Sequence, residues 1–584
     1  MSTDALPSQA PRVEPSRKFR TDAETDAEGK KLVLGLPPAR VWCGPVLAIL
    51  GLTFVLVGGA DADLTGADAA TGLAASSGFG PLGQAYGQWR PDVWPLRAAV
   101  ARLVYLLGEP GKTDNGAVLW PSAVAGLVAG WLVARRMIAA GRTTLALLFG
   151  FAWFGSIALL GHAASSGVDF LAGMATVAAL DRLIGRRSDW IAGLWASAAF
   201  LAGGWPPLLV LALAIIVLGR RDADFSLKLI VPPVLTAAAW LAWTVQAASA
   251  QAAAAALVWP ITRGLAWTLP TSFGSFAAAL ARPLDAKPAW AVPLGLLALG
   301  LPLSPFALLL ASGDLRRRIK EGAAGAMELD WLRVGVAAMV GATVVPGLAP
   351  AAALPALAGL LVAAAAGLEA AWSGGLSPRA RRAFFGIVLA LTAGWVFVAM
   401  YTTFILTIVF TYYRMVGVIL AAGSLLVAAL VWRSVETWSS RRAVVGMLVL
   451  AACLKWLHWG FYVPEWNYRY GQGPWGRAIG QWMLPHWPVY TLHEWPEDLA
   501  WAVGRPVRLI HSPQHLAFPE TRESKHVLLL ESEFENWPPS APKLVKVASF
   551  EPPHPAANRR ILARTEGVLL TPSGRVVSRV PAPE

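Results

Sequence analysis

Three aspartates stand together where the first long apolar stretch of the chain ends. Asp61 and Asp63 follow that stretch directly, and Asp68 comes about one helical turn later. Carboxylate oxygens in this arrangement can bind a divalent cation, or one carboxylate can take a proton from a hydroxyl group as a general base. A short D-x-D string also arises by chance at the solvated start of a loop. The residues alone leave both interpretations open.

A fourth aspartate, Asp169, stands in a short turn, residues 161–170, between two apolar stretches. An ionised side chain near hydrocarbon is costly, so this carboxylate should face a cavity or a partner. His162 in the same turn could be that partner, a metal ligand or a ring at the membrane interface. A single histidine of this kind is more often structural, so its role stays open.

Basic residues on the same side of the apolar stretches form a set of possible phosphate ligands. Arginine matches phosphate oxygens with a rigid fork, so several near one cavity would suit a ligand that carries phosphate. Snorkelling, or pairing with nearby acidic residues, explains at least half of the set equally well. The set is Arg90, Arg97, Arg102, Arg263, Arg282, Lys287 and Arg414.

The composition indicates that a membrane positions these residues. Of the 584 residues, 56% are hydrophobic and only 15% are charged, whereas a soluble protein has about 25% charged residues. These values exclude a disordered chain, a disulfide scaffold and an ordinary cytosolic enzyme. The two cysteines, Cys43 and Cys453, lie in apolar stretches and carry no redox information. No Walker loop, C-x-x-C or H-E-x-x-H motif is present.

Apolar stretches long enough to cross about 30 Å of hydrocarbon recur along the chain. We predict an all-α polytopic bundle of about thirteen transmembrane helices. The fifth and sixth are short and meet at Gly203–Pro207, where glycines and prolines break the helix. The predicted spans are 42–60, 115–134, 143–163, 167–184, 190–203, 206–219, 228–246, 290–312, 331–346, 352–371, 383–410, 414–432 and 443–460.

The distribution of Lys and Arg orients this bundle. The N-terminal segment and the connections on one side of the bundle carry 27 of the 49 basic residues. The connections on the other side, up to the last span, carry 8. By the positive-inside rule, the N-terminus is cytoplasmic and an odd number of spans puts the C-terminal segment outside. The membrane topology therefore explains the net charge of +13, and no nucleic-acid partner is expected. We expect a multi-pass protein of the cell (inner) membrane.

Three domains follow from this topology. Residues 1–41 are polar and predict a disordered cytoplasmic tail. Residues 42–460 form the transmembrane domain, with two long outer loops at 61–114 and 247–289. Such loops on a rigid scaffold tend to carry function. Residues 461–584 form an extracytoplasmic domain.

That last domain has the pattern of a small α/β unit. Helices are predicted at 477–483 and 496–503, and strands at 489–492, 507–510 and 525–530.

An aromatic belt over residues 456–475 should hold the base of this domain at the headgroups. Because the connection is short, we expect the domain to dock on the first outer loop.

This layout resembles the GT-C membrane glycosyltransferases, within them the lipid A aminoarabinose transferases and protein O-mannosyltransferases. Their first span ends in an outer acidic pair, as at Asp61–Asp63, and their first loop runs through a K-P-P motif, which Arg90–Pro95 resembles. The Asp169 turn resembles their T-D-x-x-L turn, and residues 199–206 their L-T-K-G-P hinge without its lysine. Residues 286–290 resemble the approach to their eighth span, and Gly347–Pro350 their late S-K-x-P segment.

The resemblance implies transfer of a sugar from a polyprenyl-phosphate-linked donor to a lipid, glycan or protein acceptor at the outer membrane face. Asp61, Asp63 and Asp169 would then be catalytic. A divalent metal ion is one candidate cofactor, and no other is implied. The substrate-binding candidates are Asp68, Arg90, His162, Lys287 and Arg414.

Two alternatives stay open at this point. Because the hinge lysine and the Arg and Glu of the first-loop motif are missing, the chain could be a non-catalytic relative that binds lipid-linked glycan or assembles complexes. A transporter or flippase is less favoured, because the spans are nearly free of buried charge, with Asp181 and Glu369 near cytoplasmic ends.

Overall fold

The structure of the chain is a computed structural model. The structure describes residues 39–56, 66–76, 84–85, 88–89, 94–107, 116–160, 168–185, 189–219, 227–247, 249–262, 272, 287–321, 325–469, 472–484, 487–493, 495, 497–505, 507–517, 525–551, 559–565, 568–570 and 576–579.

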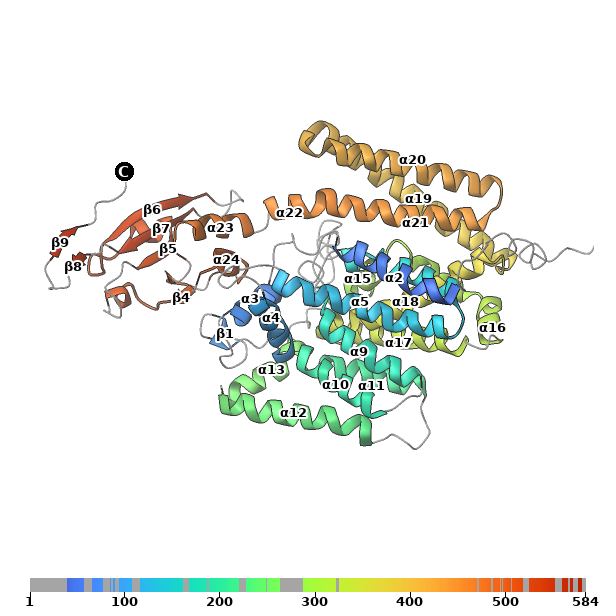
Figure 1. The fold of residues 1–584 in the computed structure, drawn as a ribbon, viewed down its shortest axis with the longest axis horizontal. Helices are drawn as coiled ribbons and strands as arrows, with labels where there is room; N and C mark the ends of the chain where they lie inside the picture. The colour runs from blue at the N-terminus through green and yellow to red at the C-terminus, as the bar shows by residue number, and fades with distance from the viewer. Residues whose placement is uncertain are drawn as a thin grey trace, which may run out of the picture.

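Helices dominate the chain up to residue 469 (Figure 1). Among the described residues, six are long and apolar enough to cross a membrane. A bent pair, 289–299 with 304–311 at 102°, would make a seventh crossing. The six are α5 (Gly116–Ala139), α12 (Leu227–Ala247), α18 (Ala349–Trp372), α19 (Pro378–Phe404), α20 (Arg414–Glu436) and α21 (Ser440–Leu457).

Several of the thirteen predicted spans correspond to shorter helices. Glycine and proline interrupt these stretches: Gly204 has φ +76° and Pro206 and Pro207 open the next helix, while Gly219 has φ +63° and ends it. Such breakers shorten helices that hydropathy alone draws as full spans. The shorter helices include α6 (Thr143–Phe154), α9 (Phe170–Ile184), α10 (Asp189–Gly203) and α11 (Pro206–Leu218).

Helix α18 is the centre of the bundle. Its sequence is apolar on every face, which is typical of a helix with neighbours all round, and its apolar window is entirely buried. It packs against α6, α9, α11 (bounds above) and α17 (Gly325–Val344). The backbones of α17 and α18 approach closely at Gly335 and Gly359: a Cβ at Gly359 would lie 2.4 Å from the Trp331 carbonyl oxygen. Small residues thus allow the close packing expected of membrane helices.

Ion pairs gather at one end of the bundle. Asp181, near the C-terminus of α9, accepts hydrogen bonds from Arg135 and Arg136 of α5. Arg142 donates to Glu328 of α17. Arg142 also donates to Glu369 near the C-terminus of α18. Asp181 and Glu369, which were predicted to lie near cytoplasmic ends of spans, therefore have partners. The opposite ends of α9 and α18 carry Asp169 and Pro350.

The last three spans form a layer of their own at one side (Figure 1). Helices α19, α20 and α21 pack on one another, and many of their large apolar side chains are exposed, including Phe397, Met415 and Trp432. Apolar exposure on this scale fits a surface in contact with lipid.

Beyond α22 (Val463–Arg469), the chain forms an α/β unit at one end of the molecule (Figure 1). Its five-stranded sheet has the order β4-β3-β5-β7-β6. β3 pairs in parallel with β4 and β5, whereas β7 pairs antiparallel with β5 and β6. The elements are α23 (Gly473–Gln481), β3 (Val489–Thr491), α24 (Glu497–Val503), β4 (Val507–Leu509), β5 (His526–Leu530), α25 (Glu531–Glu535), β6 (Leu544–Phe550) and β7 (Arg560–Thr565).

This unit confirms the two helices and three strands predicted from the sequence. Trp475 differs from its predicted role in the interfacial belt, because it packs in the α/β unit with Arg560 at 4.4 Å from its ring. The cation–π contact and the apolar cluster around α23 hold it there.

The α/β unit docks on the first loop, as expected. Helix α24 packs against α3 (Gly66–Ser76), and a Cβ at Gly72 would lie 2.8 Å from the Trp501 ring. Trp501 is fully buried in a cluster with Ala69, Leu119 and Val463. Gly72 thus lets the indole lie flat on α3.

Candidate active site

Asp169 caps the N-terminus of α9. Its Oδ1 accepts a hydrogen bond of 3.1 Å from the backbone N–H of Ala172, and its side chain is half-buried. Its own N–H donates to the Pro350 carbonyl at 3.1 Å. The turn that resembles T-D-x-x-L is therefore bonded directly to the segment that resembles S-K-x-P, 181 residues later in the chain.

The glycine hinge lies against this aspartate. A Cβ at Gly203 would lie 3.1 Å from Asp169 Oδ2 and 2.7 Å from the Ala172 Cβ. One carboxylate oxygen thus caps α9 while the other faces the hinge. The next residue, Gly204, has a positive φ and would meet the Trp94 ring at 2.3 Å if it carried a Cβ. Only glycine fits both requirements at Gly204.

Helix α4 (Pro95–Leu107) adds a positive charge. Arg97, in the first turn of α4, lies close enough to Asp169 for its charge to favour the ionised carboxylate. Trp94 precedes the helix and packs edge-on to Phe200 of α10, with ring centroids 5.8 Å apart, and at 5.0 Å to Trp240 of α12. This aromatic contact holds the start of α4 beside the hinge.

Arg102 further along α4 ties the helix to the rest of the first loop. It donates a 2.6 Å hydrogen bond to the Ala75 carbonyl in the last turn of α3. The docked α/β unit, α3, α4 and the Asp169 turn therefore form one continuous series of contacts.

Most of the other candidate residues are not placed near Asp169. Asp61, Asp63, Arg90 and His162 lie outside the described residues. For Asp68, the structure describes only its position in α3. The predicted pairing of Asp63 with Asp169 therefore remains a prediction.

Lys287 and Arg414 occupy separate positions. Lys287 is buried just before the bent helix pair, and burial lowers the pKa of its ammonium group. Arg414 opens α20 and is exposed, in the layer formed by α19 to α21.

Arg97 and Trp94 are the site residues that the sequence did not single out. Arg97 belonged to the basic set, but nothing in its spacing marked it as the neighbour of Asp169. The sequence did contain an indication for Trp94. A large aromatic ring directly precedes Pro95, and the Gly203-Gly204 pair has no side chains that would exclude such a ring.

The described residues hold no group of three or more His, Cys, Asp or Glu side chains arranged to bind a metal ion. Asp61 and Asp63 are not among them, so the predicted metal stays a prediction.

No protein-family model and no curated protein matches the sequence. Two crystal structures of ArnT from Cupriavidus metallidurans match nearly the whole chain. The apo structure matches at 13% identity with a TM-score of 0.56, covering 92% of this chain and 98% of ArnT. The structure bound to undecaprenyl phosphate matches at 13% identity with a TM-score of 0.61, covering 90% and 97%. The chain has a GT-C-like fold.

The GT-C-like fold bears on the three sequence segments that meet around Asp169. The GT-C resemblance rested on short motifs scattered along the sequence. Three of them (the Asp169 turn, the hinge and residues 347–350) meet at one end of the helical bundle, beside the start of α4. The similarity of nearly the whole chain to ArnT and the meeting of the motifs agree with each other.

Proposed function

We propose that the chain is a glycosyltransferase that moves a sugar from a polyprenyl-phosphate donor to an acceptor at the outer face of the membrane. The observation that carries this proposal is the junction at Asp169. There a carboxylate, the positive charge of Arg97 and a tightly packed glycine hinge come together at the end of a GT-C-like bundle. ArnT, which has a similar fold, has been solved with undecaprenyl phosphate.

In this proposal each candidate has a distinct role. Asp61 or Asp63 acts as the general base that removes a proton from the acceptor hydroxyl. Asp169 is the second carboxylate of the cavity, and the positive charge of Arg97 favours its ionised form. Arg90 and Arg414 hold the lipid phosphate and stabilise its charge as it leaves. Asp68, His162 and Lys287 are further substrate contacts.

The proposed topology places this chemistry outside the cell membrane. The ion-paired end of the bundle, with Arg135, Arg142 and Glu369, is rich in basic residues and faces the cytoplasm. The opposite end, with Asp169 and the docked α/β unit, faces outward. A lipid-linked donor reaches that end within the bilayer, so no soluble nucleotide sugar is needed.

The position of the charges disfavours a transporter. The acidic residues of α9, α17 and α18 that pair with Arg135, Arg136 and Arg142 lie at one end of the bundle; they are Asp181, Glu328 and Glu369. A transported solute is bound near the bilayer midplane in most secondary transporters.

The test is binding and transfer with a defined lipid. Purified full-length protein is titrated with undecaprenyl phosphate in detergent, and then assayed with a panel of polyprenyl-phosphate pentoses and hexoses and a membrane extract as acceptor. We expect saturable binding of undecaprenyl phosphate and transfer from at least one donor. Binding without transfer from any donor would instead indicate a non-catalytic lipid-binding relative, and an absence of binding would refute both.

A further inference from the structure

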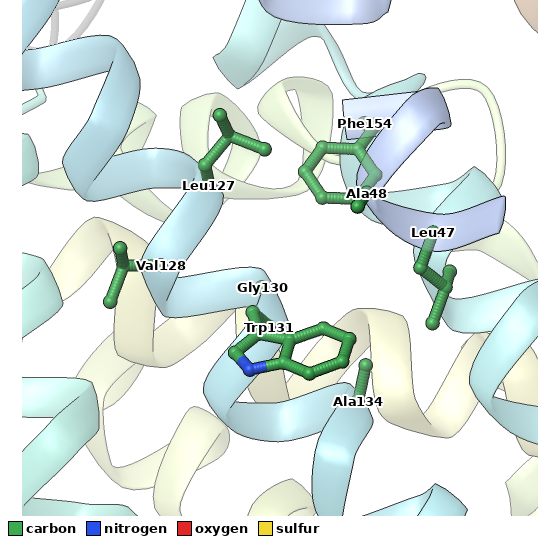
Figure 2. Close-up of a pocket in the computed structure, with 8 residues that line it drawn as sticks. All are labelled: Leu47, Ala48, Leu127, Val128, Gly130, Trp131, Ala134 and Phe154. Atoms are coloured by element: carbon green, nitrogen blue, oxygen red, sulfur yellow. The ribbon is translucent and has the colours of Figure 1, made fainter. Parts of the chain in front are cut away.

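A groove lined only by apolar side chains runs between α2 (Ala39–Leu56) and α5, and Phe154 of α6 also lines it (Figure 2). Its volume is about 300 Å³. It contains none of the residues of the Asp169 junction and no titratable side chain. The lining residues are Leu47, Ala48, Leu127, Val128, Gly130, Trp131, Ala134 and Phe154.

The groove lies along the half of α5 that ends beside the ion pairs. On α5 its lining runs from Leu127 to Ala134, and α5 ends at Ala139 beside the ion pairs. At 1.5 Å per residue, the groove extends from about 7 to about 18 Å from that end. This depth corresponds to the acyl-chain region of one leaflet, the leaflet on the side of Arg135.

A positive charge stands at the mouth of the groove. Val128, Trp131 and Arg135 are spaced by three and four residues, so they share one face of α5. Val128 and Trp131 are 50% and 42% exposed. The Arg135 side chain is 36% exposed while its Nη2 lies 2.8 Å from Asp181 Oδ2. The apolar stripe thus ends in a guanidinium that is open to the headgroup region.

We propose that the groove binds one acyl chain of an anionic phospholipid from this leaflet, with the lipid phosphate at Arg135. An apolar cavity of half this volume already stays dry and binds hydrocarbon. A further helix, about 10 Å across, does not fit in it. The phosphate of the proposed polyprenyl donor would lie at the opposite end of the bundle, beside Asp169, so the proposal does not rest on the glycosyl-transfer activity.

The first test labels the groove directly. Full-length protein in nanodiscs is photolysed with phosphatidylglycerol that carries a diazirine in one acyl chain, and the labelled peptides are mapped. We expect label on residues 47–48 and 127–134. Ala48→Trp and Val128→Trp, which fill the groove from opposite walls, should each lose most of it. Ile49→Trp is the matched control: Ile49 is 63% exposed on α2, does not line the groove, and should retain the label.

The second test addresses the headgroup. Arg135→Gln should reduce the preference for phosphatidylglycerol over uncharged diacylglycerol about fivefold, the effect of one basic residue at an anionic lipid surface. Arg433→Gln, an exposed arginine in the last turn of α20, is the control and should leave the preference unchanged.

Two results would overturn the proposal. Equal labelling of wild type and both groove-filling variants, with unchanged thermal unfolding, would show that the groove holds no specific chain. Displacement of the label by a small excess of undecaprenyl phosphate, but not by unlabelled phosphatidylglycerol, would assign the groove to the polyprenyl tail.

Discussion

At the residue scale, the most specific feature is the contact between Gly203 and Asp169. The sequence marked both positions, the first as part of a hinge and the second as an isolated carboxylate. The sequence did not predict that Gly203 and Arg97 both lie close to Asp169. These residues are 34 and 72 positions from Asp169, so their contacts depend on how α4, α9 and α10 pack. What the sequence missed here is tertiary geometry rather than residue type.

We predict that Gly203→Ala impairs transfer while leaving the fold intact. The added Cβ would lie 2.7 Å from the Ala172 Cβ and 3.1 Å from Asp169 Oδ2, so the carboxylate must move. Overpacking of this kind costs about 1–3 kcal/mol. Gly394→Ala, in α19 with no atom within 4 Å of the new Cβ, is the control and should be neutral in both activity and thermal unfolding. Equal activity of the two variants would remove the hinge from the site.

His526 on β5 predicts a pH-dependent stability of the α/β unit. It is 4% exposed, stacks on Trp487, and burial together with the charge of Arg564 lowers its pKa. Because the unfolded state binds the proton more readily, stability is full above the unfolded pKa of about 6.5 and falls as the pH drops below it. Hydrogen exchange of the β5 amides in the whole chain, corrected for intrinsic rates, should accelerate from pH 7.5 to 5.5. His526→Phe should flatten this dependence, and an unchanged slope would contradict the account.

At the element scale, the sequence predicted what local pattern controls. The strands β3, β4 and β5 are short apolar runs bounded by turn residues, and they appear within one residue of their predicted limits. It missed β6 and β7, because Lys546 and Ser549 in one and Arg560 and Arg564 in the other interrupt the apolar pattern. Those strands exist because they pair antiparallel beside β5. The partner of such a strand cannot be inferred from the sequence of that strand alone.

Docking of α24 on α3 should depend on Trp501. We predict that Trp501→Ala weakens the contact by about 3–5 kcal/mol, the cost of removing a buried indole. Crosslinks between cysteines placed on α3 and α24 should then be lost, and the α/β unit should become sensitive to protease. Trp482→Ala, which removes an indole that is 55% exposed, should leave both measurements unchanged. Retained crosslinks in Trp501→Ala would mean that other contacts hold the unit.

At the scale of the whole molecule, two charge arrangements define opposite faces. Ion pairs of Arg135, Arg136 and Arg142 gather at one end of the bundle, and Asp169, the hinge and the α/β unit gather at the other. The ArnT-like fold over 90% or more of the chain is compatible with these two faces. It also explains why composition gave the fold class: a bundle in lipid must be apolar, whichever chemistry its ends carry.

The topology is a prediction at this scale. Tags at residue 20 and residue 540 should lie on opposite sides, the first cytoplasmic and the second outside, because the basic residues favour the cytoplasmic end. Protease added to cells stripped of any outer membrane should remove only the second tag. A protected tag at residue 540 would contradict the proposed orientation.

The most direct test of the central claim is the replacement of Asp169 by Asn. Asparagine also caps a helix well, so the bond to the Ala172 N–H is kept and only the negative charge is lost. We predict a loss of glycosyl transfer of about 100-fold or more, the scale of a lost acid–base group, with normal membrane expression and unchanged thermal unfolding. Asp314→Asn, an exposed aspartate in the first turn of α16 (Gly313–Glu321), should keep full activity. Full activity in Asp169→Asn would contradict a catalytic role for the junction.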